Sequence, residues 1–99
     1  MNKRELNLKI DDDTKVINRC EDAILNINTI LNSLKLLKKA TRKMYPDNEA
    51  TDEFAEVILA TTADIMAMKT EIEEVASDTA DEMNKLIRER RTLEDGVQE

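Results

Sequence analysis

Apolar residues in the first half of the chain recur with the spacing of an amphipathic helix. When Ile17 is set at heptad position a, isoleucine or leucine fills every a position from Ile10 to Leu31, and most d positions are apolar as well. A third apolar column stands at the g positions, namely Val16, Ala23, Ile30, Leu37 and Met44. Three apolar positions in seven are typical of a bundle helix, because a two-stranded coiled coil needs only a and d. The pattern predicts a helix that ends at Met44 or Tyr45, because proline disfavours helical backbone in the residue before it.

The pattern allows two starting positions for this helix, one near residue 3 and one at Thr14. Residues 11–13 are aspartates and precede Thr14, which is a plausible N-cap with acids that favour the helix dipole. In that case residues 1–13 form a separate arm, and their local alternation allows an extended one. Apolar residues before the aspartates nevertheless stay in heptad register. We favour a helix over residues 3–44, because its length then matches that of the second helix.

A second periodic segment predicts a helix over residues 51–93. Thr51 is a suitable N-cap, with acidic residues in the turn that follows. Isoleucine or leucine recurs at most positions seven apart from Ile58 to Leu93, and we expect the seam to be completed by Phe54, Met68 and Val75. After Val75 the apolar steps change to 4-4-3, which predicts a stutter. Gly96 is then the expected stop signal.

Residues 45–50 form a short connection, so the two helices are expected to be antiparallel neighbours. Pairing across the turn predicts partners whose residue numbers sum to about 95, which places cations of the first helix opposite acids of the second. Examples are Lys39 with Glu56 and Arg42 with Glu53. The predicted fold is an all-α, long antiparallel helical hairpin. It forms a single domain over residues 1–99, with a frayed tail at 94–99.

The composition excludes many kinds of chemistry. Among 99 residues there is one glycine, one proline, one cysteine and no histidine. Many-stranded barrels, disulfide scaffolds, histidine-based catalytic sites and glycine-rich phosphate loops are therefore excluded. We expect no catalytic residue, no cofactor and no metal site, and so a protein that is not an enzyme.

The charge balance bears on the partners. Fifteen basic and 22 acidic residues give a net charge of −7, which makes direct nucleic-acid binding unfavourable. No apolar run approaches the roughly 18 residues of a membrane span, and the first residues lack the apolar core of a signal peptide. We therefore expect no membrane partner and a cytoplasmic location.

The apolar surface is too wide for one hairpin to cover. A single neighbouring helix buries one seam, and exposed apolar patches of this extent mark an interface. We expect a homodimer, in which two hairpins form a four-helix bundle or a coiled-coil-like assembly. The residues assigned to self-association are Ile17, Ile24, Ile27, Ile30, Leu31, Leu34, Leu37, Ile58, Leu59, Ile65 and Met66. A helix from another protein in the same groove is the alternative.

Both aromatic residues of the chain lie near the turn. Aromatic side chains are enriched at binding hot spots, so Tyr45, Pro46 and Phe54 form a candidate partner contact at the tip. Glu53 and Glu56 extend this contact onto the acidic face of the second helix. The same aromatic residues would also serve to close the end of a bundle. The predicted function is that of a protein–protein interaction module, an adaptor, scaffold element or inhibitor of a larger protein.

Other functional classes remain open. In length and layout the chain resembles the WXG100 proteins exported by type VII systems, which implies a secreted helical hairpin. That resemblance covers architecture alone, because Tyr45-Pro46-Asp47 replaces the Trp-x-Gly between the helices. The acidic second helix is alternatively a nucleic-acid mimic that occupies a basic groove of an enzyme. The pairs Glu53-x-x-Glu56 and Glu71-x-x-Glu74 resemble the Mg²⁺ ligands of all-α nucleotide pyrophosphohydrolases, but an acidic face exposed to solvent explains them better.

Overall fold

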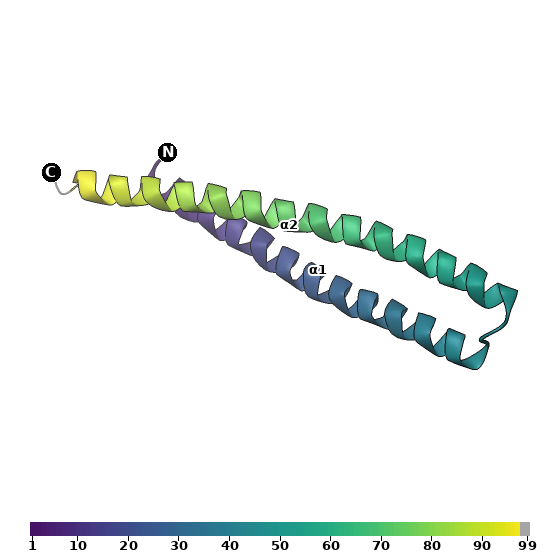
Figure 1. Ribbon diagram of the computed structural model, residues 1–99. Helices are drawn as coiled ribbons and strands as arrows, with labels where there is room; N and C mark the ends of the chain where they lie inside the picture. Colours follow the sequence, from purple (N-terminus) through teal and green to yellow (C-terminus); the bar gives the residue numbers. More distant parts are fainter. Residues whose placement is uncertain (98–99) are drawn as a thin grey trace. The chain divides into compact units, whose positions relative to one another are not determined.

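The computed structural model describes residues 1–97, and within this range the chain forms two helices joined by one turn (Figure 1). Helix α1 comprises Lys3–Met44, and helix α2 comprises Glu49–Val97. No described residue lies in a β-strand. The predicted all-α helical hairpin is therefore confirmed, and so is the end of the first helix at Met44.

Helix α1 begins at the earlier of the two predicted positions because Asn2 caps it. The Asn2 side-chain oxygen accepts a hydrogen bond from the Glu5 backbone N–H (2.9 Å), and the Asn2 amide donates to the Glu5 carboxylate (3.0 Å). This reciprocal pairing over three residues is closely related to a capping box. Residues 11–13 are helical without a break, so the start at Thr14 and the separate arm are both wrong.

Helix α2 is longer than predicted at both ends. Asn48, not Thr51, is its N-cap: the Asn48 side-chain oxygen accepts a hydrogen bond from the Ala50 N–H (2.8 Å), and the Asn48 carbonyl accepts one from the Thr51 N–H (3.0 Å). At the other end the helix passes through Gly96, which lacks the positive φ of a terminating glycine. Of the predicted frayed tail, residues 94–97 are helical, and residues 98–99 lie outside the described range.

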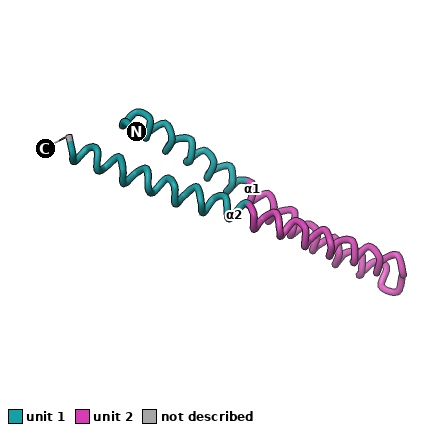
Figure 2. The backbone as a smooth tube through the Cα atoms, turned by 90° about the horizontal axis from the view of Figure 1, so that it is seen from above, with its two compact units in different colours: residues 1–22, 72–99 teal, residues 23–71 magenta. Residues whose placement is uncertain are grey.

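Contacts between the helices divide the chain into two compact units (Figure 2). Unit 1 combines residues 1–22 of α1 with the part of α2 that begins at Ile72, and unit 2 is the continuous segment Ala23–Glu71, which contains the turn. Both aromatic residues, Tyr45 and Phe54, therefore belong to unit 2.

Side-chain contacts define the helix register in unit 1. They are the hydrogen bond from Arg90 to Asn7 (3.0 Å), the contact of the Thr14 hydroxyl with the Met83 sulfur (3.5 Å) and the ion pair Lys3–Glu94 (3.2 Å). In each pair the residue numbers sum to 97. In unit 1 the sum is therefore two residues above the predicted value of about 95.

The seam of α2 keeps a continuous 4-3 spacing. Its buried and half-buried residues are Thr51, Ala55, Ile58, Thr62, Ile65, Lys69, Ile72, Ala76, Thr79, Met83, Leu86 and Arg90. Val75 is exposed and Ala76 takes the seam position, so the predicted stutter is wrong. Phe54 and Met68 also lie outside the seam. Alanine and threonine suit these positions because they let two helices approach closely, and the Thr62 hydroxyl donates to the Ile58 carbonyl (2.7 Å) of its own helix.

The buried core is thin. Its apolar members are Leu6, Cys20 and Leu86 in unit 1 and Ile27, Ala55 and Ile58 in unit 2. The thiol of Cys20 is buried, and the residue packs as a small apolar member of this core. A seam between two helices has little interior, so much of the apolar surface beside it stays exposed.

Candidate interaction surface

Unit 2 has two faces, one on each side of its seam. In each heptad the seam residues occupy positions a and d. The residue before a, at position g, lies on one side of the seam, and the residue after d, at position e, lies on the other side. Because the helices run antiparallel, positions of the same kind on α1 and α2 share a side. The two sides differ in chemistry.

The first side is an apolar surface without charge, which we call the stripe. Its members are Ile30, Leu37 and Met44 on α1 and Phe54 and Met68 on α2. All five are exposed, from 36% for Phe54 to 67% for Met44. Farther out, α1 carries only small or uncharged residues (Asn26, Ser33 and Ala40), whereas α2 carries Val57, Asp64 and Glu71. A second helix can therefore approach closely along α1, beside an acidic edge on α2.

The stripe ends at the turn in a shallow depression, which we call the tip depression. Its volume is about 330 Å³, and its lining consists of Thr41, Tyr45, Asn48, Ala50, Thr51 and Phe54. The structure therefore brings Tyr45 and Phe54 together, and Pro46 is exposed in the adjoining turn. Glu53 and Glu56 are exposed on α2 but do not line this depression.

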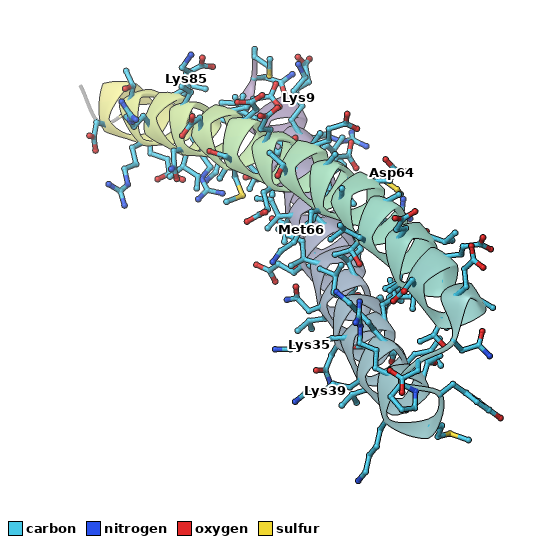
Figure 3. The ribbon with its side chains drawn as sticks, turned by 45° about the vertical axis from the view of Figure 1, so that its right-hand side comes forward. Lys9, Lys35, Lys39, Asp64, Met66 and Lys85 are labelled. Atoms are coloured by element: carbon cyan, nitrogen blue, oxygen red, sulfur yellow. The ribbon has the colours of Figure 1, made fainter. Side chains whose placement is uncertain are left out.

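The second side is an apolar groove with charged residues along it, which we call the groove. It has a volume of about 300 Å³ and is lined by Leu31, Lys35, Lys38, Ile58, Leu59, Thr62 and Met66. Leu59 and Met66 are 64% and 55% exposed. Figure 3 shows Lys35, Lys39 and Met66 along one side of unit 2 and Asp64 on the other. Leu31, Lys35 and Lys38 contribute to the lining from α1, and the other four residues contribute from α2.

Charge in unit 2 is separated by helix. The α1 part has five cations and no acid: Lys35, Lys38, Lys39, Arg42 and Lys43. The α2 part has six acids and one cation, and its acids are Glu49, Asp52, Glu53, Glu56, Asp64 and Glu71. Among the described residues, Lys3–Glu94 in unit 1 is the only ion pair within 4.0 Å. The ion pairs predicted between the helices, such as Lys39–Glu56 and Arg42–Glu53, are therefore not formed.

The structure divides the residues assigned to self-association into two groups. Ile17, Ile24, Ile27, Leu31, Leu34, Ile58 and Ile65 are buried or half-buried at the seam of their own chain. Ile30 and Leu37 lie on the stripe, and Leu59 and Met66 lie at the groove. The prediction omits Met44 and Met68 from the candidate contacts. Met44 carries a sequence signal, because it continues the seven-residue spacing of Ile30 and Leu37.

Comparison with protein-family models, curated proteins and solved structures gives no match for this chain. Within the described residues, no cluster of three or more Cys, Asp and Glu side chains is arranged to hold a metal ion. Neither helix has, over the same range, a stretch that is long and apolar enough to cross a bilayer. The exposed surfaces of unit 2 are therefore the candidate functional features.

Proposed function

We propose that the chain is a non-enzymatic protein–protein interaction module that docks onto another protein through the stripe and the tip depression. The observation that carries this proposal is where the exposed apolar residues lie. Of 16 large apolar side chains exposed among the described residues, 11 belong to unit 2, and five of these make up the stripe. Apolar residues gathered in one surface mark an interface, whereas scattered ones do not.

The chemistry around the stripe favours an amphipathic helix as the docking element. Such a helix would place its apolar face between α1 and α2 and bury the stripe residues. Its α1 side meets small or uncharged residues, while its α2 side passes Asp64 and Glu71. We therefore infer a partner helix with lysine or arginine along the edge that faces α2. A cytoplasmic location agrees with the unpaired thiol of Cys20.

The test compares Leu37→Glu, on the stripe, with Leu36→Glu on the neighbouring residue. Leu36 is also exposed but lies away from the seam on the outer surface of α1, which makes it a matched control. Both variants and the parent protein are immobilised, and captured proteins are quantified by mass spectrometry and then titrated directly. We expect a partner that binds the parent and Leu36→Glu alike, and that Leu37→Glu weakens by about tenfold or more. An identical set of captured proteins for all three, with helix content unchanged by circular dichroism, would contradict the proposal.

A further inference from the structure

We propose that two copies of this chain associate through the groove of unit 2. In this dimer the two hairpins are related by a twofold axis parallel to their helices, and the groove of one copy faces the groove of the other. Leu59 and Met66 of each copy are then covered by the partner copy. The groove and the stripe lie on opposite sides of the seam, so this inference is independent of the docking function proposed above.

The apolar part of the groove supplies the contact. Leu59 and Met66 are more than half exposed, and they lie beside a hollow of about 300 Å³ with Leu31 and Ile58 in its lining. A hollow of this size is larger than the space that one water molecule needs, so it can accept side chains. A twofold contact is self-complementary, which means that each copy both donates and receives these side chains.

The charges beside the groove decide which partner fits. The α1 edge carries Lys35, Lys39 and Arg42, and the α2 edge carries Asp52 and Glu56. Extending the register of unit 1 along the two continuous helices places Arg42 level with residue 55, between the two acids. None of these five residues forms an ion pair within its own chain, although all lie in the described range.

A twofold axis along the helices brings the basic edge of one copy opposite the acidic edge of the other. Arg42 then faces the Asp52 and Glu56 of the second copy, and the same contact is made twice. A nucleic acid or an anionic membrane would instead meet the acidic edge and be repelled. The arrangement of positive charge, apolar hollow and negative charge is therefore complementary to itself, which favours a second copy over another partner.

The stripe is less suited to this contact. Its members carry no charge, and its outer edge has acids on α2 with no cation opposite them on α1. Two stripes brought together about the same axis would form no ion pair between copies.

The experiment is a charge exchange read out by solution mass. Light scattering behind a sizing column, at about 10 µM and tenfold lower, is expected to give about twice 11.3 kDa for the parent chain. Arg42→Glu alone and Glu56→Arg alone each place like charges across both contacts, and each is expected to raise the dimer Kd by about tenfold or more. An equimolar mixture of the two variants restores both contacts as opposite charges and should return the dimer mass.

Leu37→Glu is the control on the opposite side of the seam, and it should leave the dimer intact. Three outcomes overturn the proposal. The parent chain is a monomer at both concentrations; the mixture of variants stays monomeric while circular dichroism reports intact helices; or Leu37→Glu dissociates the dimer and Arg42→Glu does not. The last result would assign the dimer to the stripe. Loss of the dimer without loss of partner capture would leave the proposed function standing.

Discussion

Asp13 occupies a seam position of α1 in unit 1, and the seam residues before and after it are Ile10 and Ile17. The Oδ2 atom of Asp13 is buried and is the only such side-chain oxygen without a hydrogen-bond partner among the described residues. An unsatisfied buried polar atom costs about 1–3 kcal/mol. We therefore expect Asp13→Leu to raise the free energy of unfolding by about that amount, as measured by urea denaturation.

Asp12→Leu is the matched control, because Asp12 is the adjacent aspartate and is exposed. Its effect on the free energy of unfolding should stay within about 0.5 kcal/mol. A decrease in stability for Asp13→Leu would mean that the carboxylate contributes to the fold, for example by fixing the register of the seam.

What the sequence predicts at this scale depends on residue size. Ile10, Ile17 and Ile24, at the predicted a positions, lie at the seam because large aliphatic residues mark the seam of α1 clearly. The seam of α2 contains Ala55, Thr62 and Ala76, which carry no strong hydrophobic signal. The sequence pattern instead favours larger neighbours such as Phe54, Met68 and Val75, because hydrophobicity alone does not distinguish which of two adjacent residues lies inside. The same error hides part of the stripe.

The two helices lie close to the bounds predicted from the sequence. The differences between predicted and observed bounds arise at the caps and at the turn. One feature of α2 can be tested directly, namely that its seam runs through Ala76 and not Val75. Val75→Ala removes two methyl groups from an exposed side chain, so we expect the free energy of unfolding to change by less than about 0.5 kcal/mol. Ile72→Ala truncates a half-buried seam residue of the same unit and should cost about 2 kcal/mol.

Both variants are compared by thermal or urea unfolding under the same conditions. A stutter at Val75 would instead make both truncations costly, because Val75 would then be packed in the seam together with Ile72 and its truncation would leave a cavity. Equal and small effects would indicate instead that this part of the pair contributes little to stability. Residue type alone also does not identify the N-cap of α2. Asn48 and Thr51 are both acceptable N-cap residues, and the hydrogen bond to the Asn48 side chain distinguishes them.

For the whole molecule, the separation of basic and acidic residues is visible in the sequence. Whether these charges pair within one hairpin is not. The prediction pairs Lys39 with Glu56 and Arg42 with Glu53 inside one hairpin, but neither pair lies within 4.0 Å in the structure. No residue of unit 2 forms an ion pair with another described residue. The cations and acids of unit 2 are thereby left available for contacts with another molecule. The sequence predicts the surface composition, whereas the arrangement of the two faces depends on which residues occupy the seam.

The two faces of unit 2 should therefore respond differently to salt. Raising the ionic strength from about 0.01 M to about 1 M shortens the Debye length from about 30 Å to about 3 Å. The groove dimer depends on exposed charges, so its Kd, measured by analytical ultracentrifugation, should rise several-fold over this range. Docking through the uncharged stripe should change less, because apolar burial is not screened by salt and only Asp64 and Glu71 contribute charge there. If docking instead weakens steeply while the dimer Kd stays constant, the acidic face of α2 is the docking site. The nucleic-acid-mimic interpretation would then be favoured over the stripe.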